Sequence, residues 1–149
     1  MPYESPISIR KATEADFPEW LRMRKALWPE ASYDELRDQK HLFEADNFSC
    51  FLAESNSKIV GFVELSLRPY VNGCDTSPVA FIEGIWVDEN CQKNGIGRKL
   101  VEAAEAWAKS LSLKELASDT RIESHHSIHA HNRWGFEETE RVVYFRKGL

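Results

Sequence analysis

The sequence lacks the features expected of a membrane, secreted or nucleic-acid-binding protein. It has no apolar run near the roughly 20 residues that cross a bilayer, and no apolar signal-peptide core at its N-terminus. Its three cysteines, Cys50, Cys74 and Cys91, are odd in number and show no paired spacing, which favours a reduced, cytoplasmic setting. Lysine and arginine number 19 against 24 aspartates and glutamates, a net charge of -5 that argues against nucleic acid as a partner. An acidic chain is compatible instead with a cationic substrate.

The rest of the composition is ordinary for a globular protein. The chain is 42% hydrophobic and 29% charged over 149 residues, without repeats or low-complexity linkers, which predicts one domain over residues 1–149. Hydrophobic periodicity predicts an α/β (α+β) fold with a mixed, mostly antiparallel sheet flanked by helices, in the order β-α-α-β-β-β-α-β-α-β. The expected strands are residues 7–12, 48–54, 58–68, 79–87, 114–118 and 141–147. The expected helices run from the Thr13 cap to Pro29, from Ser32 to about Asp46, from the glycine loop to Leu111, and over 123–134.

The most informative stretch is "QKNGIGRKL", which follows the apolar strand "VAFIEGIWV" after a short break. Gly95 and Gly97 before a helix can leave backbone N–H groups free to bind phosphate. A Walker loop needs Gly-Lys-Ser/Thr after its second glycine, and a dinucleotide fingerprint needs Gly or Ala where Leu100 stands, so both patterns are excluded. A pyrophosphate-binding loop remains, alongside the alternative that two glycines merely shape a tight strand-to-helix connection.

The loop, the element order and the late "WGF" resemble the GNAT superfamily of acyl-CoA-dependent N-acyltransferases, whose hallmark Q/R-x-x-G-x-G/A is met by Gln92, Gly95 and Gly97. The segments "RKALWP", "YVNGCDTSPVAFIEGIWV", "ASDT" and "GFEETERVVYFRK" resemble one branch, the aminoglycoside 6′-N-acetyltransferases. The resemblance covers nearly the whole chain and implies acetyl-CoA as co-substrate, a polycationic aminoglycoside as acceptor, antibiotic resistance as outcome, and a homodimer. An enzyme for another polyamine or small amine metabolite, and a non-catalytic acyl-CoA-binding module, are the alternatives.

The resemblance also assigns the cofactor contacts. It implies that the Ile85–Val87 stretch pairs with the pantetheine arm, with the Val87 N–H facing the thioester oxygen. It places Ser124 where the family usually has a cofactor-contacting Asn, and His131 where many members have a Tyr that protonates the departing sulfur. The full expected cofactor set is Ile85, Trp86, Val87, Gln92, Lys93, Asn94, Gly95, Ile96, Gly97, Arg98 and Ser124.

Carboxylates in apolar surroundings indicate where a cationic substrate binds. Glu83 lies inside "VAFIEGIWV", where an unpaired charge would be costly, and strand alternation predicts that it shares a face with Phe81, Ile85 and Val87. Asp119 follows the next strand, either as a ligand group or as a helix cap. The resemblance implies substrate contacts at Trp28, Tyr70, Glu83, Asp119 and Glu140. Without it, Trp28 is more simply a core residue and Glu140 part of a solvated turn.

The expected mechanism is direct transfer in a ternary complex, because the three cysteines show no His-linked nucleophile arrangement. The substrate ammonium would lose its proton to Glu83 or Asp119 through water, and His131 could protonate the thiolate. No metal is expected, since the histidines of "HHSIHAH" lack an accompanying ligand set. The apolar "RVVYFRK" could pair across a dimer.

Overall fold

The computed structural model describes residues 6–92 and 94–149 of the chain. Its strands and helices follow one another in the order β1 (Ile7–Lys11), α1 (Phe17–Leu27), α2 (Tyr33–Arg37), β2 (Phe48–Ser55), β3 (Lys58–Arg68), β4 (Val79–Val87), α3 (Ile96–Ser110), β5 (Leu116–Ser118) and α4 (His125–Arg133). Short 3₁₀ turns lie at Glu14–Asp16, Lys40–Glu44 and Glu89–Cys91. Every helix among the described residues is too short or too polar to cross a lipid bilayer.

The described strands form one sheet in the order β1-β2-β3-β4-β5. The first four strands are antiparallel to their neighbours, whereas β5 is parallel to β4. The β4–β5 pairing covers only Ala80 to Ile82, while β4 stays paired with β3 as far as Val87. β5 therefore ends half-way along β4, and an opening in the sheet follows the last pair.

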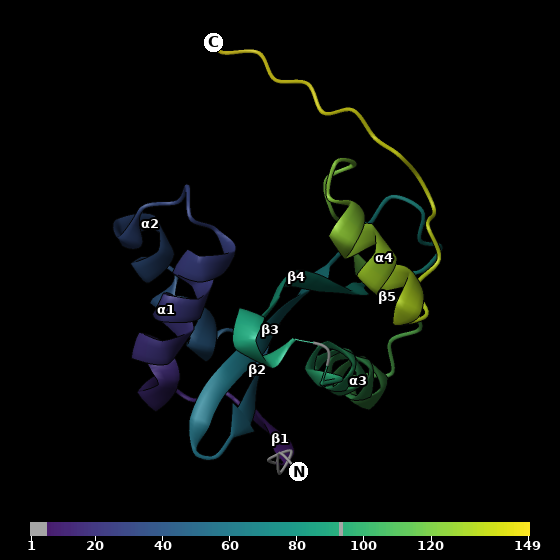
Figure 1. Cartoon of the computed structure of the whole chain (residues 1–149). Helices are drawn as coiled ribbons and strands as arrows, with labels where there is room; N and C mark the ends of the chain where they lie inside the picture. The colour runs from purple at the N-terminus through teal and green to yellow at the C-terminus, as the bar shows by residue number, and fades with distance from the viewer. Residues whose placement is uncertain (1–5, 93) are drawn as a thin grey trace.

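Helices cover both faces of the sheet, with α1 and α2 on one side and α3 and α4 on the other (Figure 1). On the α3 side, Leu100, Val101 and Ala104 recur at helical spacing and pack on buried residues of the central strands such as Val63. On the α1 side, Trp20 and Met23 pack on Leu52 and Phe62. Residues of β3 alternate between the two clusters, which explains why its sequence is apolar at nearly every position.

The structure confirms the predicted order of elements from β1 to α4 but not the strand expected at the C-terminus. The second helix is also shorter than expected, because α2 ends at Arg37 and a 3₁₀ turn follows. Residues 136–149 form no helix or strand and lead away from the sheet (Figure 1). A strand requires a partner edge for its N–H and C=O groups, and this segment meets none within its own chain. The predicted strand over 141–147 is therefore wrong for a single copy of the chain.

Candidate active site

The opening between β4 and β5 contains a β-bulge at Glu83. Glu64 of β3 pairs with Gly84 and Leu65 pairs with Ile82, so Glu83 is the extra residue. The Ala80 N–H donates towards β5, to Glu115 O at 3.3 Å, whereas the Asp88 N–H donates towards β3, to Val60 O at 2.8 Å.

Residues an even number apart in a regular strand direct their N–H groups to the same side. Ala80 and Asp88 do not, so the bulge has reversed the alternation between them. Since its neighbour Asp88 donates towards β3, Val87 directs its N–H to the opposite side, where β5 has already ended. A backbone donor thus faces the opening in the sheet.

The bulge also decides which face each side chain occupies. Ile85 and Val87 pack against the cluster on the α3 side, while Glu83 lies on the α1 side beside Ser66 and Phe81. The prediction that Glu83 shares a face with Ile85 and Val87 is therefore wrong, although it holds for Phe81. Simple alternation failed because one inserted residue moves everything after it to the other face.

The Glu83 carboxylate has specific partners. Arg68 donates from Nε to Oε1 at 2.9 Å and from Nη2 to Oε2 at 2.8 Å, and Ser66 Oγ donates to Oε1 at 2.5 Å. Partial burial raises the pKa of Glu83, but hydrogen bonds from Arg68 and Ser66 outweigh it and leave the pKa below its ordinary value. Glu83 is therefore ionised at neutral pH and is a weak base.

A cavity of about 550 Å³ lies between these strands and the first helices. Glu83 and Ser66 line it from the sheet, and Trp28, at the end of α1, lines it from the helical side. Trp28 packs directly on Gly84, where an added Cβ would lie 2.8 Å from the indole ring. The remaining lining residues are Arg24, Ala31, Glu35, Leu36, Gln39, His41, Leu42, Phe48 and Glu64. The predicted substrate residues Trp28 and Glu83 thus meet in one cavity.

The other predicted substrate residues do not line this cavity. Asp119 directly follows β5, is exposed, and lies near enough for its charge to act on Arg68. Tyr70 is 72% exposed in the loop after β3, and Glu140 lies exposed in the C-terminal segment. The structure therefore brings Asp119 towards Glu83 through Arg68 and leaves Tyr70 and Glu140 in solvent.

The glycine loop has the geometry of a helix start with a left-handed entry. Gly95 has φ 74°, a conformation that side chains disfavour, and Lys99 N–H makes the first described backbone bond of the turn, to Gly95 O at 3.1 Å. The N–H groups of Ile96, Gly97 and Arg98 precede that bond at the helix N-terminus, where an anion binds favourably.

Several loop side chains contact protein groups. An added Cβ at Gly97 would lie 2.7 Å from Trp134, so this glycine permits close contact between α3 and the end of α4. Gln92 Nε2 donates to Val87 O at 3.3 Å, and Arg98 Nη2 donates to Arg133 O at 2.5 Å. Asn94 is exposed, and Lys93 lies outside the described residues. Shaping the connection and binding pyrophosphate are thus compatible roles for the same glycines.

Ser124 and His131 belong to α4. Ser124 is the half-buried N-cap of that helix. The Nδ1–H of His131 donates to Ser127 O at 2.7 Å, and its Nε2 lies 2.8 Å from Ser118 Oγ at the end of β5. Both ring nitrogens therefore contact protein groups, and the Ser118 hydroxyl lies at the one nearer to the sheet.

Sequence reasoning missed two arginines that partner carboxylates beside the cavity. Arg68 binds Glu83, and Arg24 binds Glu64, whose side chain is 2% exposed. Burial raises the pKa of Glu64, while the charge and hydrogen bonds of Arg24 oppose this rise. Glu64 could have been found, since it interrupts the apolar strand "KIVGFVELSLR" as Glu83 interrupts its neighbour. Arg68, at a strand end beside a polar loop, had no such signal.

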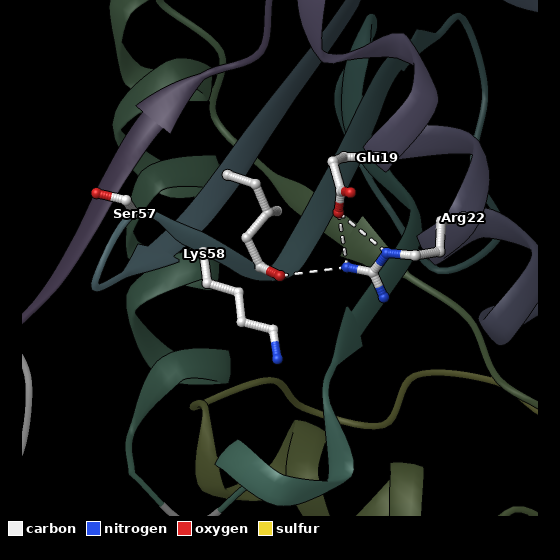
Figure 2. Close-up of a pocket in the computed structure, with 5 residues that line it drawn as sticks. Glu19, Arg22, Ser57 and Lys58 are labelled. Carbon is white, nitrogen blue, oxygen red and sulfur yellow. Dashed lines mark hydrogen bonds and ion pairs between the residues drawn. The ribbon is translucent and has the colours of Figure 1, made fainter.

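A second, smaller hollow of about 280 Å³ lies at the opposite end of β3, lined by Glu19, Arg22, Ser57, Lys58 and Ile59 (Figure 2). Figure 2 shows Arg22 already paired with Glu19 and with the Ile59 carbonyl oxygen. No residue predicted for substrate or cofactor lines it. Among residues 6–92 and 94–149, no three potential metal ligands cluster together.

Known proteins resemble this chain over most of its length. The Acetyltransferase (GNAT) family matches residues 9–136. The chain is 44% identical over 144 residues to an aminoglycoside N(6')-acetyltransferase type 1 of Stenotrophomonas maltophilia, covering 95% of this chain and 94% of that protein. A protein of the same name from Salmonella enteritidis is 38% identical, covering 95% and 99%.

Solved structures agree with the fold and with the family. AAC(6')-Iy in complex with the bisubstrate analog CoA-S-monomethyl-acetylneamine has a TM-score of 0.93 and 37% identity, covering 97% of this chain and 100% of that one. The aminoglycoside 6'-N-acetyltransferase AAC(6')-Ih of Acinetobacter baumannii has a TM-score of 0.90 and 37% identity, covering 97% and 99%. As its glycine loop and element order predicted, the chain belongs to the GNAT family of acetyltransferases.

Proposed function

We propose that this protein transfers the acetyl group of acetyl-CoA to the 6′-amino group of aminoglycoside antibiotics, in a ternary complex, and thereby gives resistance. The observation that carries the proposal is the bulge at Glu83, which directs a carboxylate into the cavity and the Val87 N–H into the opening of the sheet. Relatives named for this activity at 35–44% identity support the substrate class.

For acetyl-CoA, we propose that the pantetheine arm enters where β5 stops and pairs with Ile85 to Val87, Trp86 included. The Val87 N–H then polarises the thioester carbonyl as a single oxyanion donor. The pyrophosphate takes the free N–H groups at the start of α3, with Gln92, Ser124 and the loop Lys93–Arg98 around it. The chemistry that acetyl-CoA supplies is an activated acetyl group.

For the amine, we propose that Glu83 anchors an ammonium group, with Trp28 as a wall of the cavity and Tyr70, Asp119 and Glu140 as further contacts. Because both Glu83 oxygens already accept hydrogen bonds from Arg68 and Ser66, the substrate's proton passes through water to the exposed Asp119. The neutral amine then attacks the thioester carbon, the attached nitrogen gives its second proton to water, the C–S bond breaks, and the thiolate leaves. The imidazolium form of His131 protonates it through Ser118, and a His131→Ala enzyme with full turnover would exclude that role.

Thiol release from acetyl-CoA, measured with kanamycin, tobramycin and spermidine, tests the proposal. We expect turnover with the aminoglycosides and its loss in Glu83→Gln, while acetyl-CoA binding stays intact. Glu54→Gln, a carboxylate change on the distant strand β2, is the matched control and should behave like the wild type. Preference for spermidine would indicate the polyamine alternative, and CoA binding without thiol release from any amine would indicate a non-catalytic module.

We further propose a homodimer in which the C-terminal segment of each copy adds a strand beside β5 of the other. This segment exposes Val142, Val143, Tyr144 and Phe145 by 46%, 74%, 81% and 92%, an apolar stretch of strand-forming residues. Within the described part of one chain, the outer edge of β5 has no strand partner. Because Glu140 directly precedes this strand, it would lie between the two copies in such a dimer.

Sedimentation tests the exchange. The wild type should sediment at twice the 17.2 kDa chain mass, and a chain truncated after Glu140 should sediment as a monomer while keeping a cooperative melting transition. A monomeric wild type would refute the homodimer, and a truncated chain that stays dimeric would refute the exchange. The three free cysteines among the described residues support the proposed cytoplasmic location, which fractionation would check.

A further inference from the structure

Arg68 already occupies the position proposed for the substrate's ammonium group. Its guanidinium takes both oxygens of Glu83, at 2.9 and 2.8 Å, and lies 3.5 Å from the centre of the Phe81 ring. Hydrogen bonds from Arg68 to Glu83 raise the pKa of Arg68, and the charge of Asp119 acts in the same direction. An internal cation thus lies among the carboxylates that are proposed to bind a cationic substrate.

A guanidinium and an alkylammonium make the same demands on this site. Both carry one positive charge, donate N–H groups to carboxylate oxygens and bind favourably against an aromatic face. Oε1 of Glu83 accepts hydrogen bonds from Arg68 and Ser66, and Oε2 accepts one from Arg68, so three of the roughly four acceptor sites are taken and no further cation can bind both oxygens. A substrate ammonium and Arg68 therefore compete for the same carboxylate.

The position of Arg68 lets it leave. It is the last residue of β3, a loop follows it, and its side chain is 40% exposed, so it can rotate into water. The half-buried Glu83 that it leaves is 32% exposed, and the incoming ammonium group replaces the lost charge there. The neighbouring Arg24–Glu64 pair offers the contrast, because its side chains are only 5% and 2% exposed and Arg24 is also bonded to Leu36 O. An exposed ion pair exchanges its partner at modest cost, whereas a buried one does not.

We infer that Arg68 is a stand-in cation, which occupies Glu83 in the free enzyme and is displaced when an ammonium group of the substrate binds there. This inference rests on the proposed function. Displacement replaces the charge of Arg68 at Glu83 with the charge of one substrate ammonium group, so a monoamine gains no electrostatic energy. A polycation gains energy because its further ammonium groups bind other carboxylates. Arg68 thereby selects for polycationic acceptors.

Steady-state kinetics of Arg68→Gln test the inference with kanamycin as acceptor. Exposed ion pairs contribute up to about 1 kcal/mol, so removing the competitor should lower the KM for kanamycin about fivefold. The kcat and the KM for acetyl-CoA should stay near the wild-type values. The ratio of kcat/KM for kanamycin to kcat/KM for a simple monoamine should become smaller. The matched control is Arg10→Gln, since Arg10 of the distant strand β1 is also 40% exposed and forms a similar two-bond pair with Asp16, in the 3₁₀ turn that follows this strand.

Each outcome decides the inference. A KM that rises would show that Arg68 positions Glu83 for substrate, and an unchanged KM would show that it does not compete; either result overturns the stand-in role. If wild-type enzyme acetylates no aminoglycoside, the proposed function fails, and calorimetry of kanamycin binding then tests Arg68 separately. Tighter binding to Arg68→Gln than to wild type supports displacement, and equal or weaker binding overturns it. Melting curves establish that both variants are folded.

Discussion

Glu64 and Arg24 form a buried ion pair whose disruption should be the most destabilising charge change in this protein. Arg24 donates to both Glu64 oxygens at 3.1 to 3.2 Å, and Trp20 Nε1 donates to Oε2 at 2.9 Å. Arg24 also donates to Leu36 O at 3.0 Å and to Gln39. The pair therefore joins β3, α1, α2 and the segment after α2 beneath the candidate site.

Glu64→Gln keeps the shape of the side chain but leaves the Arg24 cation buried without a counter-charge. Removing one member of a buried pair costs about 3–5 kcal/mol. For a chain of this size each kcal/mol lowers the Tm by about 2–4 °C, so the expected fall is about 6–20 °C. Thermal denaturation at neutral pH measures it. The exposed pair Arg37–Asp34 is the control, and Arg37→Gln should shift the Tm by no more than about 4 °C.

A double variant separates charge from packing. Arg24→Met with Glu64→Leu removes both charges and retains apolar volume, so it should recover most of the stability lost by Glu64→Gln, short of the bonds that Leu36, Gln39 and Trp20 lose. If Glu64→Gln melts within about 2 °C of the wild type, the pair is not the buried junction that its geometry indicates. If the double variant is no more stable than the single one, packing rather than the uncompensated charge explains the loss.

Two other substitutions test the glycine loop and the loss of stability at acidic pH. Gly97→Ala places a Cβ 2.7 Å from Trp134, so it should lower the stability measured by thermal denaturation by about 1–3 kcal/mol and raise the KM for acetyl-CoA. Gly148→Ala is the control, because an added Cβ there has no atom within 4 Å, and it should change neither quantity. Hydrogen bonds from Arg10 lower the pKa of Asp16 from 3.8 to about 2, so its stabilisation is present above pH 4 and is lost as the pH falls towards 2. Asp16→Asn should lower the free energy of unfolding at pH 7 by about 1–2 kcal/mol, and this free energy should then fall less steeply below pH 4. Urea titrations at several pH values measure both effects. A variant whose stability falls below pH 4 as steeply as that of the wild type would refute this role of Asp16.

The sequence predicted the fold well because its strongest hydrophobic patterns depend on which face of a helix or strand is buried, and this can be read locally. The 3.6-residue spacing from Leu100 to Leu111 and the doubly apolar strand 79–87 each admit one arrangement, a helix packed on a central strand. The helix start at the glycine loop was equally readable, because Gly95 adopts the positive φ that glycine best tolerates. The C-terminal strand was mispredicted for a general reason: "RVVYFRK" has strand propensity, but propensity does not supply a partner edge.

The site was only partly predictable, because its geometry depends on a register shift that no local pattern reports. Glu83 was singled out correctly as a charge in an apolar strand, yet its face relative to Ile85 was wrong. Whether a strand contains an extra residue depends on its pairing with β3, where Leu65 faces Ile82 and Glu64 faces Gly84. Pairings across the sheet also determine which cation meets Glu83. Arg68 is 15 residues away in sequence and was invisible to motif-based reasoning.

Glu64 and Glu83 show how one sequence signal leads to two roles. Both interrupt apolar strands, both lie beside the same cavity, and both are bound by an arginine from the first half of the chain. Glu64 lies opposite the bulge, where it pairs with Gly84, and it is buried beneath α1, so loss of its arginine would leave an uncompensated buried charge. Glu83 lies at the bulge, where the strand turns its carboxylate to the cavity and its arginine to solvent. A carboxylate whose counter-ion can be exchanged is the one suited to binding a cationic acceptor, and the bulge is what distinguishes it from its structural neighbour.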